Sequence, residues 1–239
     1  MILKTRLFVD QPVGLNQSFE LNSDQSHYLL SVLRLSDGNL IGTFDGHNGE
    51  WAAELHQISK KRVSITCKEK VRAQQNPPDL WLCFAPIKKA RTDFIVEKAT
   101  ELGIGTIIPV QTDFTNSERI KQDRLQAHAR EAAEQCGGTY VPEVTAMHKL
   151  SDLLKTWPED RFLLFCDEDQ VGTQVDFDAL PRGKWAILIG PEGGFSKAER
   201  TRLNNMPQAH SVSLGPRILR ADTAAVTALT LWHHRLGDW

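Results

Sequence analysis

The sequence predicts a small β-rich module followed by an α/β domain. Between Asn39 and Glu69, apolar and polar residues alternate with period two, which is typical of antiparallel strands with one buried face. Residues 73–79 are polar and contain two prolines, as a linker would. Beyond Leu80, apolar runs alternate with helical patterns. We therefore expect domains at residues 1–72 and 73–239.

The N-terminal module is expected to hold three strands and a short helix. The strands are LIGTF, EWAAELHQI and RVSITCKE, and a turn at Asp45–Gly49 joins the first two. Asn22, Ser23 or Asp24 can cap a helix through HYLLSVLR, which ends before Asp37.

The C-terminal domain is expected to be a mostly parallel sheet covered by helices. Its predicted strands are LWLCFAP, IIPVQ, RFLLFCD, WAILIG and HSVSLG. The runs LLFC and WAILIG are apolar on both alternating faces, which indicates strands buried from both sides. Helices are predicted over TDFIVEKATELG, from about Glu118 to Cys136, from Lys197, and over TAAVTALTLWHHRLG.

The composition excludes several classes of protein. The N-terminus turns polar too soon for a signal peptide and no apolar run spans a membrane, so we expect a soluble, cytoplasmic protein. The net charge of −2 gives no global attraction for a polyanion, so RNA binding would need local basic patches. The four cysteines are far apart and the histidines lack ligand spacing, which argues against disulfides and metal sites.

The segment after WAILIG is a glycine-rich turn. It reads Gly-Pro-Glu-Gly-Gly over Gly190–Gly194, and Ser196 with Glu199 then forms a capping box that starts a helix. Such a turn lets the backbone approach a nucleotide-like ligand, although an ordinary strand-to-helix turn is an equal alternative. The segment matches neither GxGxxG nor GxxxxGK[ST], which disfavours NAD and nucleoside triphosphates.

A second turn, over Leu214–Thr223, also follows a strand and precedes a helix, so the two turns can enclose one ligand. Arg217 and Arg220 each offer a planar donor fork for a carboxylate, a phosphate or a base edge, or else form surface salt bridges. Asp222 is a candidate N-cap of the last helix.

Four ordered blocks resemble the RsmE-type 16S ribosomal RNA uracil-N3 methyltransferases of the SPOUT superfamily. The blocks are FIVEKATELGIGTIIPV, EAAEQCGGTYVPEV, ILIGPEGGFSKAE and LGPRILRADTAA. The N-terminal segments LLSVLR and LIGTFDG are similar to the PUA-like RNA-binding domain of that family. The resemblance therefore spans nearly the whole chain.

The resemblance implies a SPOUT-type α/β domain with a trefoil knot, a homodimer, and S-adenosyl-L-methionine held by the knot loops. True knots are too rare to predict from sequence patterns. The implied reaction is methylation of uracil N3 in 16S ribosomal RNA, at uridine 1498 in the usual numbering, with naked RNA or the small ribosomal subunit as substrate and no metal. The implied cofactor-binding residues are Ile189, Gly190, Pro191, Glu192, Gly193, Gly194, Leu214, Gly215, Arg217, Ile218 and Leu219.

Catalytic and RNA-binding residues are predicted as well. Arg220 is expected to meet the negative charge that develops on uracil, and Asp222 is a candidate base. We expect local cations to bind RNA phosphates. These are Arg34, Lys60, Lys61, Arg62, Lys88, Lys89, Arg91 and Lys98.

Three positions depart from the family pattern. Ala221-Asp222 stands where Thr-Glu is usual, Gly138 stands where an Arg is common, and residues 112–117 lack the usual Glu-Arg-Ser character. The Asp222 side chain is shorter than the usual Glu, so its carboxylate reaches less far toward a substrate proton. The missing Arg removes one RNA contact.

Two other functions remain open, and the apolar stripe of the last helix has two interpretations. The alternatives to uracil-N3 methylation of 16S ribosomal RNA are a SPOUT methyltransferase that acts on another RNA position, and a non-catalytic ribosome-assembly protein that binds RNA through its β module. The last helix carries Val226, Leu229 and Trp232 on an apolar stripe, which is either a dimer surface or part of the core.

Overall fold

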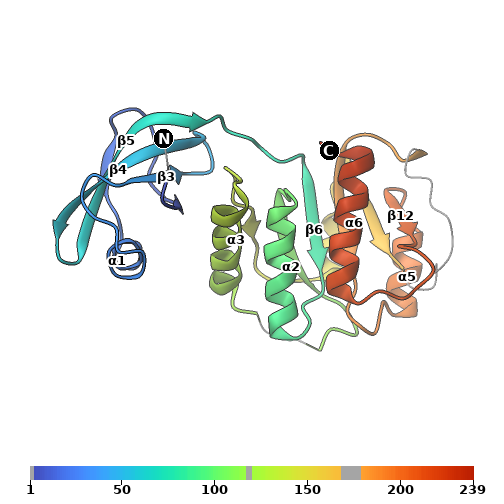
Figure 1. Ribbon diagram of the computed structural model, residues 1–239. Coiled ribbons are helices and arrows are strands. Elements are labelled where there is room, and N and C mark those ends of the chain that lie inside the picture. Colours follow the sequence, from blue (N-terminus) through green and yellow to red (C-terminus); the bar gives the residue numbers. More distant parts are fainter. Residues whose placement is uncertain (1–2, 117–119, 168–178) are drawn as a thin grey trace. The chain divides into compact units, whose positions relative to one another are not determined.

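The chain divides into two units in the computed structural model, which describes residues 3–116, 120–167 and 179–239 (Figure 1). One unit contains Met1–Asn76 together with Ala133–Val141. The other contains Pro77–Ala132 together with Pro142–Trp239. The inclusion of Ala133–Val141 in the N-terminal unit has no signal in the sequence.

The N-terminal unit is built on a five-stranded sheet of order β1-β3-β4-β5-β2. The strands are β1 (Arg6–Phe8), β2 (Ser18–Glu20), β3 (Leu40–Phe44), β4 (Glu50–Ser59) and β5 (Arg62–Arg72). The three predicted strands β3, β4 and β5 are confirmed, and they pair antiparallel. The edge strands β1 and β2 have three residues each, too few to show a periodic pattern.

A short helix packs beside this sheet, as predicted. In α1 (Ser23–His27), Asn22 is the N-cap, and its side chain accepts from the Gln25 amide in a capping box. The chain then continues in a π-helical turn, η1 (Tyr28–Val32), which closes with a 2.9 Å bond from the Leu33 amide to the Tyr28 carbonyl. The helical segment therefore exists where the sequence predicts it, but its second turn is wider than an α-helix.

The C-terminal unit contains a seven-stranded sheet of order β12-β10-β11-β6-β7-β8, with β9 also paired to β7. The strands are β6 (Leu80–Phe84), β7 (Thr106–Gln111), β8 (Glu143–Val144), β9 (His148–Lys149), β10 (Arg161–Cys166), β11 (Lys184–Ile189) and β12 (Ala209–Val212). Every pairing is parallel. The five predicted strands are confirmed, and the two-residue strands β8 and β9 are additional.

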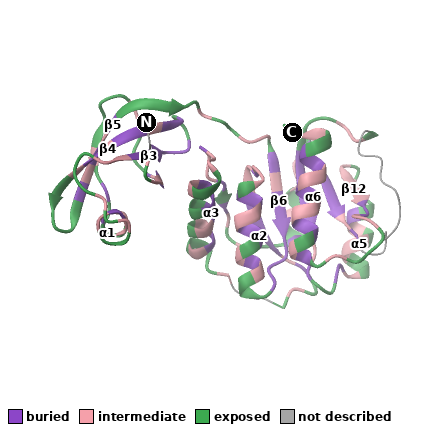
Figure 2. Ribbon diagram, viewed as in Figure 1, coloured by how far each residue is buried: buried purple, intermediate pink, exposed green. Residues whose placement is uncertain are grey.

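Helices cover both faces of this sheet, as the doubly apolar strands predict. They are α2 (Lys89–Glu101), α3 (Gln122–Cys136), α4 (Leu150–Leu153) with the 3-10 turn η2 (Leu154–Thr156), α5 (Lys197–Asn204) and α6 (Ala221–Leu236). On β11, Ala186 and Leu188 pack toward the α4 and α5 side, and α6 packs against α2 and β11. Figure 2 shows the strands buried between half-exposed helices.

The structure corrects two predictions about α6 and adjusts one about α3. Asp222 is not the N-cap, because α6 begins at Ala221 and Arg220 occupies the cap position. The dimer-surface alternative is wrong for Leu229 and Trp232, which belong to the core, while Val226 of the same stripe is half-buried. The helix predicted from about Glu118 begins at Gln122, and residues 117–119 lie outside the described part of the chain.

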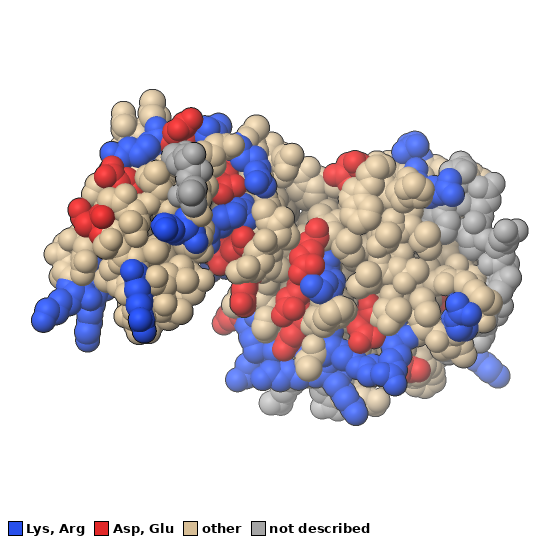
Figure 3. Space-filling model, in the orientation of Figure 1, with Lys and Arg blue, Asp and Glu red and all other residues tan. Residues whose placement is uncertain are grey.

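Parallel pairing places the carboxyl ends of all seven strands along one edge of the sheet, which we call the carboxyl edge. Helices α2, α3, α5 and α6 begin near this edge, and Figure 3 shows Lys and Arg side chains gathered where α2 and α6 begin. The cations next to these strand ends and helix starts are Lys88, Lys89, Arg91, Lys121, Arg124, Lys149, Lys197, Arg217 and Arg220.

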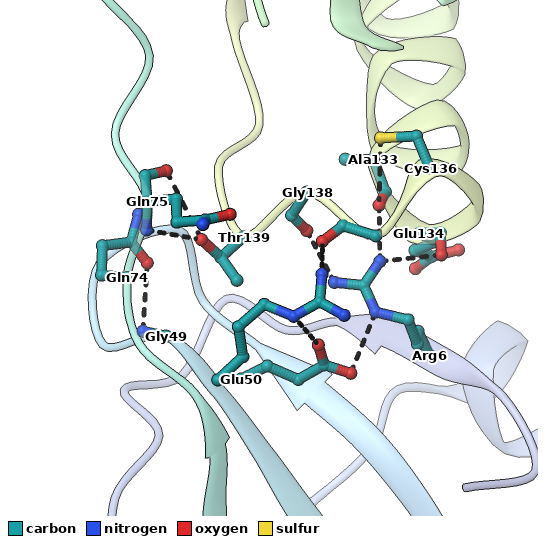
Figure 4. A network of polar contacts seen from close by, with 12 residues as sticks. Arg6, Gly49, Glu50, Gln74, Gln75, Ala133, Glu134, Cys136, Gly138 and Thr139 are labelled. Atoms are coloured by element: carbon teal, nitrogen blue, oxygen red, sulfur yellow. Dashed lines mark hydrogen bonds and ion pairs between the residues drawn. The ribbon is translucent and has the colours of Figure 1, made fainter. Parts of the chain in front are cut away.

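In the N-terminal unit, Arg6 binds the end of α3 (Figure 4). Its guanidinium donates to the carbonyls of Ala133 at 2.7 Å, Glu134 at 2.9 Å and Gly138 at 2.6 Å. The same group pairs with Glu50 at 2.9 Å. Arg6 therefore caps carbonyls that a helix C-terminus leaves without intrahelical partners.

We predict that Arg6→Ala destabilises the protein by about 3 kcal/mol, because it leaves the 3% exposed Glu50 side chain with Arg72, at 3.6 Å, as its remaining ion pair among the described residues. Urea denaturation followed by circular dichroism measures this change. The control is Arg62→Ala, which breaks an exposed pair with Glu20 and should change the midpoint little. Equal shifts in the two variants would contradict the capping role.

Candidate functional site

A pocket opens at the carboxyl edge, where β10, β11 and β12 end. It has a volume of about 650 Å³, part of which is open to solvent. Its lining residues are Cys166, Asp167, Ile189, Gly190, Pro191, Glu192, Gly194, Phe195, Val212, Ser213, Leu214, Gly215, Arg217, Ile218, Leu219, Ala221 and Ala224.

The first wall of the pocket is the glycine-rich turn after β11. The Gly194 amide donates to the Pro191 carbonyl at 2.9 Å, and Gly194 has a φ of 67°, which favours glycine. A Cβ on Gly190 would lie 3.1 Å from Cζ of the buried Phe195 ring. The turn is therefore tight, and its glycines are required by backbone conformation and by packing.

The capping box that follows this turn is confirmed. The Glu199 amide donates to the Ser196 hydroxyl at 3.2 Å, and the Ser196 amide donates to a Glu199 carboxylate oxygen at 2.9 Å. This pair fixes the start of α5 directly after the turn.

The second wall is the loop between β12 and α6. Gly215 has a φ of 114°, and the Ser213 hydroxyl donates to its carbonyl at 3.2 Å. Apolar side chains of Leu214, Ile218 and Leu219 line the pocket, and Ile218 is 72% exposed. This wall therefore offers the pocket an apolar surface.

The end of β10 forms the floor. The Asp167 carboxylate is buried and pairs with Arg200 at 3.2 Å. Burial raises the pKa of the Cys166 thiol to about 12, so this sulfur is a neutral lining group at physiological pH.

The structure brings together ten of the eleven residues predicted for the cofactor. Gly193 is the exception, since the position of its missing side chain faces Phe114 instead of the pocket. The family resemblance also implies contacts from the end of the LLFC strand, and Cys166 at that end lines the pocket. Sequence patterns carry no signal for the lining residues Asp167, Val212, Ser213, Phe195, Ala221 and Ala224, because their positions depend on which strands are neighbours.

Arg220 and Asp222 lie at the rim of the pocket. They flank Ala221, which lines it, at the start of α6. The Asp222 carboxylate lies 3.7 Å from Nε of Arg91 on α2, so the first turns of the two helices are joined. Arg220 is exposed, and neither it nor Arg217 has an ion pair within the described ranges.

The predicted RNA-binding cations fall into three groups. Lys88, Lys89 and Arg91 lie at the carboxyl edge, where Lys88 is the N-cap position of α2 and no side chain caps that helix. Arg34, Lys60 and Lys61 are exposed on the N-terminal unit, where Arg62 pairs with Glu20. Lys98 is not brought to the carboxyl edge, because it lies in the last turn of α2 and pairs with Glu101 at 2.6 Å.

Two further properties concern the described part of the chain. It contains no helix long and apolar enough to cross a membrane. Within the same residues, no group of three or more His, Cys, Asp or Glu side chains is arranged to hold a metal ion.

Two family models match this sequence. One is described as an RNA methyltransferase domain and matches residues 74–233, and the other is described as an RNA methyltransferase PUA domain and matches residues 21–66. The ribosomal RNA small subunit methyltransferase E of Rickettsia conorii is 31% identical over 228 residues, which cover 94% of this chain and 93% of that protein. The protein of the same name from Bacillus subtilis is 28% identical, with 89% and 88% covered.

Solved structures agree with these matches. The ribosomal RNA small subunit methyltransferase E of Neisseria gonorrhoeae, bound to S-adenosyl methionine, is 26% identical with a TM-score of 0.89 over 98% of this chain and 99% of that chain. A putative methyltransferase of Legionella pneumophila, in complex with the bound cofactor SAM, is 26% identical with a TM-score of 0.90 and full coverage of both chains, 100% each.

The fold and the matched domains thus define a methyltransferase of RNA with an N-terminal PUA domain. The chain belongs to the RNA methyltransferase family, and within it to the group of ribosomal RNA small subunit methyltransferase E. The family resemblance and the predicted fold class are confirmed. The trefoil knot stays a prediction.

Proposed function

We propose that this protein transfers a methyl group from S-adenosyl-L-methionine to uracil N3 in 16S ribosomal RNA, at uridine 1498. The observation that carries the proposal is the pocket formed by the two glycine-containing loops at the carboxyl edge. Relatives that carry the ribosomal RNA small subunit methyltransferase E name, and a neighbour solved with S-adenosyl methionine, support it.

The residues present fit this cofactor. Ile189, Leu214 and Ile218 offer an apolar surface for an adenine ring. Four residues of the turn at Gly190–Gly194 line the pocket, and a side chain on Gly190 would press on Phe195 and shift the turn. When bound, the cofactor would supply an activated methyl group, since breaking its C–S bond converts the sulfonium into a neutral thioether that leaves.

The protein's own residues then have to orient uracil, exclude water and receive the N3 proton. As that proton leaves, negative charge spreads onto the uracil oxygens, and the exposed Arg220 guanidinium at the rim is placed to meet it. Asp222, on the same helix start, is the candidate proton acceptor, and Arg91 pairs with its carboxylate at 3.7 Å.

The direct test is methylation of 16S ribosomal RNA, naked and in small subunits, from a strain that lacks this protein. We expect the methylated nucleoside to be 3-methyluridine at one position. A methyl group found on another base would keep the enzyme class and change the target. Binding of RNA without any transfer would support an assembly role instead.

A homodimer is also proposed, from the family resemblance alone. Because Leu229 and Trp232 belong to the core, the partner surface has to use other residues. Light scattering of the intact protein at micromolar concentration measures the oligomeric state, and a fully active monomer would contradict the proposal.

We predict that Gly194→Val weakens S-adenosyl-L-methionine binding by tenfold or more, because a β-branched residue at a φ of 67° shifts the turn. Calorimetry measures the affinity. The control is Gly38→Val, which meets the same backbone penalty at a φ of 79° with no neighbouring atoms within 4 Å of its Cβ. Unchanged affinity in a folded Gly194→Val protein would remove this turn from the site.

We predict that RNA affinity depends on cations of both units. Lys60→Ala with Lys61→Ala, and separately Lys88→Ala with Lys89→Ala, should each reduce the salt dependence of binding by roughly 0.7 per lost phosphate contact. The control is Lys155→Ala with Lys184→Ala, which removes the same charge from cations paired with Asp152 and Asp160. Equal effects in all three double variants would show that only net charge matters. Deleting the N-terminal residues 1–72 would be a poorer test of RNA binding, because the segment Ala133–Val141 packs within the N-terminal unit and would lose its contacts.

We predict that Arg220→Ala lowers the single-turnover rate about a hundredfold with cofactor affinity nearly unchanged, as for loss of one oxyanion donor. Arg220→Lys should recover part of the rate, since a point charge does not reproduce the planar fork. Rapid-quench measurements with saturating cofactor give the rate. A variant with weaker cofactor binding and a normal saturated rate would make Arg220 a binding residue.

A further inference from the structure

An aromatic side chain stands exposed beside the pocket without a role in the core. Phe114 follows β7 at the carboxyl edge and is 47% exposed. The exposed part of the ring adds no apolar area to the core and is accessible to a ligand.

Side-chain bonds hold the segment Thr112–Thr115 in a fixed turn. The Thr112 amide donates to the Thr115 hydroxyl at 2.9 Å, and the two hydroxyls share a further bond of 2.8 Å. Phe114 is therefore carried on a backbone that its neighbours constrain.

The same segment is joined to the start of α5, next to the glycine-rich turn. The Asp113 amide donates to Glu199 at 2.9 Å, and the Ser196 hydroxyl donates to the Asp113 carboxylate at 2.5 Å. These bonds use the two capping-box residues of α5. The turn of Phe114 and the turn that lines the pocket are thus parts of one hydrogen-bonded assembly.

Phe114 contacts that turn at Gly193. A Cβ built on Gly193 would lie 3.4 Å from Cβ of Phe114 and 3.7 Å from two of its ring-side carbons. The neighbouring residues Glu192 and Gly194 line the pocket. The ring therefore packs against the turn between two lining residues and leaves its remaining surface exposed.

We propose that Phe114 stacks on the base that is methylated and holds it beside the cofactor pocket. This inference rests on the proposed function. An unpaired RNA base turned out of its strand is typically bound by stacking on an aromatic ring. The cations of the carboxyl edge are available for the flanking phosphates, while the ring supplies the flat apolar face that cations lack.

The test compares Phe114→Leu with Phe114→Tyr in the full-length protein. Leucine keeps an apolar cover over Gly193 and removes the aromatic face, whereas tyrosine keeps that face. We expect Phe114→Leu to lower kcat/KM for RNA roughly tenfold, the size expected for one lost stack, with unchanged S-adenosyl-L-methionine affinity and unfolding midpoint. Phe114→Tyr should behave as the wild type. The matched control is Phe94→Leu, an aromatic of α2 that is 39% exposed and lies under Lys98.

A second measurement reports stacking itself. A short RNA with 5-iodouridine at the methylated position is irradiated in complex with the wild-type protein, since this probe crosslinks to aromatic rings in contact with it. We expect the crosslinked peptide to contain Phe114. If the wild type methylates 16S RNA while Phe114→Leu keeps full activity, or while the crosslink lies elsewhere, the inference is overturned and the proposed function stands. If the wild type transfers no methyl group, the proposed function fails and this inference fails with it.

Discussion

Parallel pairing of all seven strands in the C-terminal unit is the constraint on which the site depends. Parallel strands point their carboxyl ends to one edge, so loops that are distant in the chain emerge side by side. The loops after β10, β11 and β12 meet there and form the pocket. The starts of α2 and α6 meet at the same edge, where Arg91 and Asp222 pair. Reversing β10, β11 or β12 would move one of the three loops that form the pocket to the opposite edge of the sheet.

Around that edge, the backbone is held by short-range polar contacts. The capping box of Ser196 and Glu199 does more than start α5, because both side chains also bind Asp113 from the loop after β7. The pocket wall and the neighbouring loop are therefore fixed by the same two residues. A site built this way positions a ligand by backbone shape and leaves the exposed side chains, such as Arg220 and Phe114, free to meet a second substrate.

The N-terminal unit depends on a different device. Its sheet packs on its own apolar core. Arg6 pairs with the buried Glu50 carboxylate and donates to two carbonyls at the end of α3. Gly138 lies in this network as a carbonyl acceptor for Arg6. Gly138 stands where the family commonly has an Arg. In this protein the backbone carbonyl of Gly138 accepts a hydrogen bond instead, and the guanidinium that donates it belongs to Arg6 on β1.

The sequence by itself determined the longer elements and the family. The alternating runs of β3 to β5, the doubly apolar strands β10 and β11, and the caps at Asn22 and Ser196 are local properties, and the structure confirms each of them. Only the tertiary structure decided which loops meet. Packing alone turned Leu229 and Trp232 into core residues, directed Gly193 toward Phe114, and placed Cys166 and Ala224 in the pocket. The physical reason is that periodicity records which face of an element is apolar, whereas strand order and long-range hydrogen bonds select the neighbour that covers it.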